Sequence, residues 1–143
     1  MTISRTVGRL TIRILLAAPD GIRSSLRKVL EESPDWEVVG EADDGCEAVR
    51  LADDLRPDVV LIDIGTSSIG GIEATRRITL RSPQTHVLVM GTYPDDAYVS
   101  RVRQAGGRGY LLKDSADILL QPAITALTQG RSFFHNRDIT STR

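Results

Sequence analysis

Five short apolar segments alternate along the chain with segments in which hydrophobic residues recur every three or four positions. The apolar segments are rich in β-branched residues. The one that begins at Val59 has no polar alternation, which is typical of a strand buried on both faces of a parallel sheet. The intervening helical patterns predict crossovers that place helices on both faces of that sheet. The expected strands are residues 11–17, 36–42, 58–63, 86–90 and 109–112, and the expected helices are residues 21–32, 44–55, 72–80, 95–105 and 115–129.

Two residues set local expectations for the helices. Asp20 precedes the first helical segment and is well placed to cap its N-terminus. Pro122 lies inside the last segment and cannot donate a helical hydrogen bond, so we expect that helix to start late or to kink. Residues 1–10 and 131–143 show no periodicity, which predicts an N-terminal arm and a C-terminal tail or linker around one domain, residues 11–130.

The candidate chemistry lies where the central strand ends. Asp63 closes the apolar run, and a turn-rich segment, residues 65–71, follows it. The flavodoxin-like strand order 2-1-3-4-5 would bring the ends of the first, third and fourth strands to one crevice, the switch point at which open α/β sheets bind ligands. Lys113 closes the fifth strand at the same edge. We therefore expect Asp63 and Lys113 to face one another there.

Composition narrows the class of protein without naming a ligand. A chain of 143 residues with 41% hydrophobic and 26% charged residues fits one globular domain, and a net charge of -1 does not call for nucleic acid. Cys46 is the only cysteine, so a reducing cytoplasm is the simplest compartment. The chain has neither a secretory signal pattern nor an apolar run near the roughly 20 residues of a membrane helix, so we expect no membrane contact.

Four stretches of the chain carry a family resemblance. RPDVVLIDI, GGIEATRRI, VLVM and GYLLKD resemble the receiver domains of bacterial two-component response regulators, most of all the NarL/FixJ-type subclass with a LuxR-type output domain, over residues 13–130. The resemblance implies a (βα)5 flavodoxin-like sandwich, a signalling protein rather than an enzyme, and a sensor histidine kinase as partner. It also implies transcription control through a DNA-binding helix-turn-helix that this chain lacks. GRSFF, residues 130–134, resembles the start of the linker to that domain.

The resemblance assigns roles to single residues. Asp63 matches the aspartate that attacks a phosphohistidine or a small phosphodonor and becomes an acyl phosphate. Lys113 matches the lysine that pairs with the phosphoryl group, a role that suits a flexible ammonium. Tyr110 matches the aromatic residue that moves between outward and inward positions on activation. The positions that would contact the phosphoryl group are Gly65, Gly91 and Thr92.

The resemblance is incomplete at the site itself. Family members end the first strand with two adjacent acids that help to hold Mg²⁺, whereas this chain has Ala18 and Pro19, which offer no side-chain oxygen. Asp20 is the residual acid that a shorter loop could bring into the pocket. Gly91 replaces a threonine or serine, and Thr92 should point to the other side if the strand continues. We therefore expect weak Mg²⁺ binding, no bound cofactor and no set of metal ligands.

Two versions of the function follow, and two alternatives stay open. In the ordinary version Asp63 is phosphorylated and the last two helices change their affinity for partners. In the degenerate version, which the missing acids and hydroxyl favour, phosphorylation is slow or absent and dimerisation or another ligand carries the signal. One alternative is a flavodoxin-like binder of a cofactor or small molecule through the Gly/Ser loop, although aromatic residues, which a flavin needs, make up only 4%. The other is a purely structural domain, a homodimer through the helix at 95–105, the strand at 109–112 and the helix at 115–129.

Overall fold

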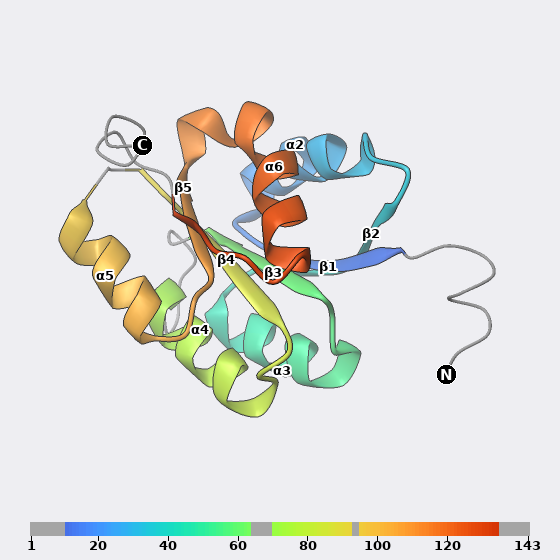
Figure 1. Cartoon of the computed structure of the whole chain (residues 1–143). Coiled ribbons are helices and arrows are strands. Elements are labelled where there is room, and N and C mark those ends of the chain that lie inside the picture. The colour runs from blue at the N-terminus through green and yellow to red at the C-terminus, as the bar shows by residue number, and fades with distance from the viewer. Residues whose placement is uncertain (1–10, 64–69, 93–94, 135–143) are drawn as a thin grey trace.

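The computed structural model describes residues 11–63, 70–92 and 95–134, which form a six-stranded parallel sheet between two layers of helices (Figure 1). The strand order is β2-β1-β3-β4-β5-β6, and each neighbouring pair is parallel. The predicted flavodoxin-like order 2-1-3-4-5 is therefore confirmed. The strands are β1 (Ile12–Ala17), β2 (Trp36–Ala42), β3 (Val59–Asp63), β4 (His86–Gly91), β5 (Gly109–Leu112) and β6 (Phe133–Phe134). The helices are α2 (Asp20–Glu31), α3 (Gly45–Leu55), α4 (Gly70–Arg81), α5 (Asp96–Gln104), α6 (Ala116–Thr128) and a short 3-10 helix, η1 (Lys113–Ser115).

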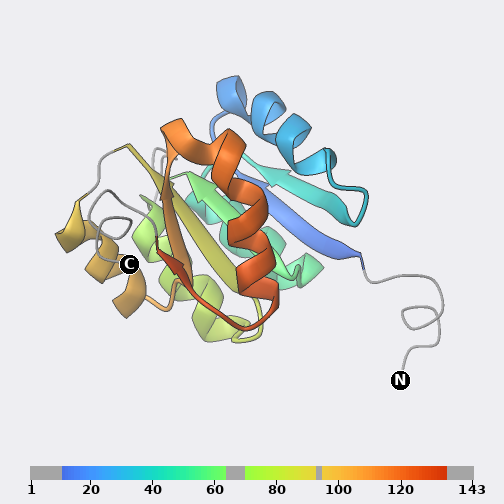
Figure 2. The same ribbon diagram turned by 45° about the horizontal axis from the view of Figure 1, so that its top comes forward.

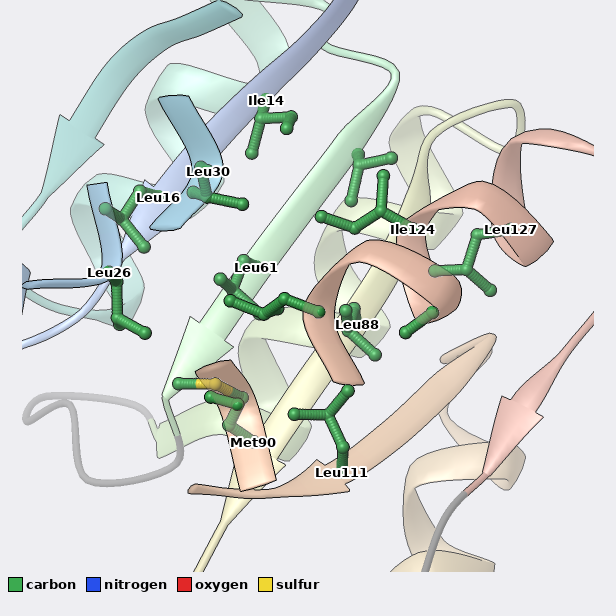
Figure 3. Packing of buried hydrophobic residues seen from close by; sticks show 14 of the residues in the cluster. Ile14, Leu16, Leu26, Leu30, Leu61, Leu88, Met90, Leu111, Ile124 and Leu127 are labelled. Atoms are coloured by element: carbon green, nitrogen blue, oxygen red, sulfur yellow. The ribbon is translucent and has the colours of Figure 1, made fainter. Parts of the chain in front are cut away.

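Side chains along the central strand alternate between two hydrophobic cores. Val59 and Leu61 of β3 point to the core covered by α2 and α6, which Figure 3 shows from close by, with Leu61 among the labelled side chains. Val60 and Ile62 point to the opposite core, which is covered by α3, α4 and α5 (Figure 2). All five residues of β3 are buried, so the run needs no polar positions, and its lack of alternation has a direct physical cause. The polar residue at its end, Asp63, stands out for this reason.

The starts of α3 and α2 follow from local chemistry. Asp44 caps α3 by accepting a hydrogen bond from the Glu47 amide at 2.9 Å, and the Glu47 carboxylate accepts one from the Asp43 amide at 2.9 Å. At α2 the predicted cap is wrong. Pro19 takes the capping position without a side-chain hydrogen bond, and Asp20 is the first helical residue. A proline at the start of a helix loses no hydrogen bond, since the first amides have no partner in the helix.

α6 passes through its proline. The helix begins at Ala116 and continues beyond Pro122 to Thr128, so the expectation of a late start is wrong. Pro122 lies on the exposed side, while Leu120 and Ile124 are fully buried in the core beneath the helix. Burial of that apolar face stabilises the helix in spite of the missing donor, because tertiary packing outweighs local propensity.

The segment predicted as a tail or linker begins with a sixth strand that the sequence analysis did not predict. In β6, Phe133 pairs in register with Gly109, and Phe134 pairs with Tyr110. Phe133 packs against the core under α6, whereas Phe134 is 8% exposed and belongs to the core under α5. Two consecutive aromatic residues can fill opposite cores only in an extended segment, so burial imposes strand geometry where the sequence has no periodicity.

Candidate functional site

The carboxyl edge of the sheet brings Asp63 and Lys113 together. Asp63 is the last residue of β3 and is 0% exposed, and Lys113 follows β5 as the first residue of η1. β4 separates the two strands, and the lysine side chain spans it, so that Nζ lies 2.9 Å from Asp63 Oδ1. The prediction that these two residues meet at one edge is confirmed.

The two members of this ion pair differ in their access to solvent. A buried carboxylate needs a nearby positive charge or hydrogen-bond donors, because water no longer solvates it. The 2.9 Å separation is that of a charge-assisted hydrogen bond. The Lys113 side chain is 34% exposed, so its ammonium sits at the mouth of the site and can turn towards an incoming anion. The arrangement places a buried carboxylate beside a partly exposed ammonium group at the carboxyl edge of the sheet.

Among the described residues at this edge, the side chains do not form a magnesium site. Mg²⁺ requires several oxygen ligands in octahedral geometry. Ala18, fully buried after β1, and Pro19, which follows it, present none from their side chains. Within residues 11–63, 70–92 and 95–134 no group of three or more histidine, cysteine, aspartate or glutamate side chains is close enough to hold a metal ion.

Asp20, the acid that a shorter loop could have brought into the pocket, faces solvent. Its side chain is 92% exposed and accepts a hydrogen bond from Arg23 at 2.7 Å. Arg23 itself is only 14% exposed and also forms ion pairs with Glu41, at 3.3 Å, and with Asp43. One arginine thus gathers the carboxylates at the ends of β1 and β2, an arrangement that spacing along the chain did not reveal.

Gly91, at the end of β4, is covered by a tyrosine ring. A Cβ atom built at Gly91 would overlap the hydroxyl oxygen of Tyr110 and lie 2.7 Å from its Cζ and 2.8 Å from its Cε1. Real Cβ atoms do not approach other atoms this closely, so no larger residue fits here unless the ring moves. The phenol of Tyr110 occupies the room that a threonine or serine side chain would take. Sequence analysis missed this contact, although a glycine inside a strand signals close approach.

Tyr110 is enclosed in this position. It is 1% exposed, and the ring of Tyr98 on α5 lies 6.0 Å away, centroid to centroid, at a tilt of 58°. Burial, together with smaller contributions in the same direction from the negative charge that Tyr98 and Asp95 can carry, raises the pKa of Tyr110 to about 12. The aromatic residue predicted to switch is therefore seated inward, with its hydroxyl against Gly91.

The remaining predicted contacts are only partly described. Thr92 follows the end of β4 and is exposed. Gly65, together with most of the Gly/Ser loop at 65–71, lies outside the described residues. Cys46 is exposed near the start of α3.

Comparison with known proteins gives the family. Residues 19–125 match the response regulator receiver domain. The chain is 42% identical over 120 residues to the transcriptional regulatory protein LiaR of Bacillus subtilis (strain 168), covering 83% of this chain and 57% of that one. It is 39% identical over 114 residues to the transcriptional regulatory protein DegU of Brevibacillus brevis, covering 79% and 48%. The chain thus spans about half the length of the curated relatives it matches.

Solved structures agree in fold and family. A two-component response regulator of the LuxR family from Aurantimonas sp. SI85-9A1 superposes with a TM-score of 0.85 at 34% identity, covering 92% of this chain and 94% of that one. The signal receiver domain of NarL from Mycobacterium tuberculosis gives a TM-score of 0.80 at 30% identity, covering 85% and 98%.

Proposed function

The chain belongs to the response regulator receiver family, and from that premise we propose that Asp63 is its phosphoacceptor, in a pocket that has lost its magnesium ligands. It is the receiver domain of a two-component response regulator related to transcriptional regulators. The observation that carries the proposal is the pairing of Lys113 Nζ with buried Asp63 at 2.9 Å, at an edge where Ala18 and Pro19 supply no oxygen.

The proposed reaction is transfer of a phosphoryl group to a carboxylate. An oxygen of Asp63 attacks phosphorus, a P–O bond forms, and the P–N bond of a phosphohistidine breaks, with the imidazole nitrogen leaving with the electron pair and taking up a proton. Lys113 leaves the carboxylate and faces the phosphoryl oxygens, where its ammonium offsets the added negative charge.

We expect this transfer to be slow, and the domain to act as a degenerate switch. A divalent cation neutralises charge during phosphoryl transfer, and a pocket with one lysine and one carboxylate cannot replace it fully. Gly91 also supplies no hydroxyl to the phosphoryl group.

The partners follow from the family. Receiver domains of response regulators interact with histidine kinases and often dimerise. For this chain we propose a sensor histidine kinase as phosphodonor, DNA contact only through an output domain outside the chain, and the cytoplasm as compartment. No described helix is long and apolar enough to cross a membrane. We further propose a homodimer through α5, β5 and α6, on which Ile118 is 72% exposed.

Labelling with acetyl phosphate tests the phosphoacceptor. We expect faint, slow labelling that is lost in Asp63→Asn, retained in the control Asp35→Asn at an exposed carboxylate, and little changed by magnesium. Restoring acids in Ala18→Asp/Pro19→Asp should make labelling faster and magnesium-dependent. Efficient magnesium-dependent labelling of the unaltered chain would contradict the degenerate pocket, and labelling that survives Asp63→Asn would contradict the assignment of Asp63.

A further inference from the structure

The inward side chain of Tyr110 lies between Gly91 of β4 and Phe134 of β6. We propose that Gly91 and β6 together hold Tyr110 inward in every state of Asp63, so that the face formed by α5, β5 and β6 stays fixed. This inference rests on the proposed function, in which Asp63 is the phosphoacceptor. It adds that the acceptor and this face are uncoupled.

The first side of the confinement is Gly91. The family resemblance places a threonine or serine here, and the Cβ atom of either would overlap the Tyr110 ring as it lies in this structure. At Gly91 there is no side chain to move, and the ring lies where a Cβ atom would overlap its hydroxyl oxygen. No side chain of residue 91 therefore competes with the Tyr110 ring for this space.

The second side is β6. Phe134 is the register partner of Tyr110 on the neighbouring strand, and both side chains belong to the core under α5. The guanidinium of Arg103 on α5 lies 3.9 Å above the centre of the Phe134 ring, a cation–π contact that joins the helix to the strand. Phe134 thus lies beside Tyr110 at the edge of the sheet, and the Arg103 side chain holds its ring in place.

The backbone is built to bring β6 this close. The Phe133 amide donates a hydrogen bond to the Arg108 carbonyl at 3.0 Å. A Cβ atom at Gly109 would lie 2.8 Å from the Phe133 carbonyl oxygen, so β6 reaches β5 only because Gly109 has no side chain. The segment after α6 is consequently part of the sheet and extends the face that contains Tyr110.

The helix layer completes the enclosure. Tyr98 covers the phenol with its ring 6.0 Å away, and Val99 and Val102 of α5 pack into the same core. Moving Tyr110 outward would leave a hole between Gly91 and α5 and would press on Phe134. Packed cores resist both changes, since cavities and overpacking each destabilise.

Fluorine NMR of the chain labelled with 3-fluorotyrosine tests this, with the Tyr110 resonance assigned by Tyr110→Phe. We expect one buried Tyr110 resonance at the same position in the unaltered chain and in Asp63→Asn. In Gly91→Thr we expect that resonance to shift towards the position of a solvent-exposed tyrosine. We also expect the Phe133 amide, which donates a hydrogen bond to the Arg108 carbonyl, to lose hydrogen-exchange protection, because Phe134 of the same strand is the register partner of Tyr110. The control is Gly21→Ala, where an added Cβ meets nothing within 4 Å, and it should change neither signal.

Two results would overturn the inference. One is a Tyr110 resonance that moves or splits when Asp63 becomes asparagine, and the other is an unchanged resonance and unchanged β6 protection in Gly91→Thr. Should Gly91→Thr fail to fold, Gly91→Ala carries the same test with a smaller side chain. The acetyl phosphate labelling experiment tests the proposed function independently of this inference. Fast labelling with an unmoved Tyr110 contradicts only the slow phosphotransfer, and a Tyr110 that responds to Asp63 contradicts only the uncoupling.

Discussion

Replacing Lys113 by alanine should destabilise the fold through a residue that lies far from it in sequence, Asp63. The substitution removes the ammonium 2.9 Å from a carboxylate that is 0% exposed. The carboxylate stays at the end of β3, because the strand around it is buried on both faces. The cost is therefore mainly that of leaving a buried negative charge without its cation.

The size of this cost lies between two limits. An exposed ion pair contributes about 0.2–1 kcal/mol, and breaking a fully buried pair costs about 3–5 kcal/mol. Asp63 meets the buried limit, but the Lys113 side chain is 34% exposed and is screened by water. We therefore expect Lys113→Ala to lower the free energy of unfolding by about 2 kcal/mol.

Urea unfolding at neutral pH measures this, with a double-mutant cycle that adds Asp63→Asn. Once the charge on residue 63 is removed, Lys113→Ala should cost much less, and the coupling energy should be roughly 1–2 kcal/mol. Lys28→Ala, at an exposed lysine on α2, is the matched control and should stay within about 0.5 kcal/mol of the unaltered chain. A coupling energy near zero would refute the pairing on which the site depends.

Two further predictions concern titration and capping. Because burial raises the pKa of Tyr110 to about 12, the contribution of its phenol to stability is fully present below pH 10 and is lost as pH rises through 12. Spectrophotometric titration should show this phenol ionising at higher pH than an ordinary tyrosine. A normal titration of all three tyrosines would contradict the enclosure. Removing the α3 cap with Asp44→Ala should cost about 1 kcal/mol in the same urea assay, whereas Asp20→Ala, which removes no cap, should cost clearly less.

The main features of fold and site could be predicted from local pattern. Apolar runs of strand length separated by helical periodicity specify a parallel α/β sheet, and the position of Asp63 at the end of such a run places it at the ligand-binding edge. Strand β6 could not be predicted in this way. Two consecutive phenylalanines show no hydrophobic periodicity. They form a strand because Phe133 and Phe134 pack into two different hydrophobic cores.

Other features arise only when distant segments pack. That Arg23 also pairs with Glu41 and Asp43, and that the Tyr110 ring lies on Gly91, could not be read from spacing, because these contacts join elements separated in sequence. Periodicity and residue type act over a few neighbouring residues, which is enough to choose helices, strands and the edge where chemistry occurs. The room around a side chain is set by every element that packs against it, and only the folded chain fixes it.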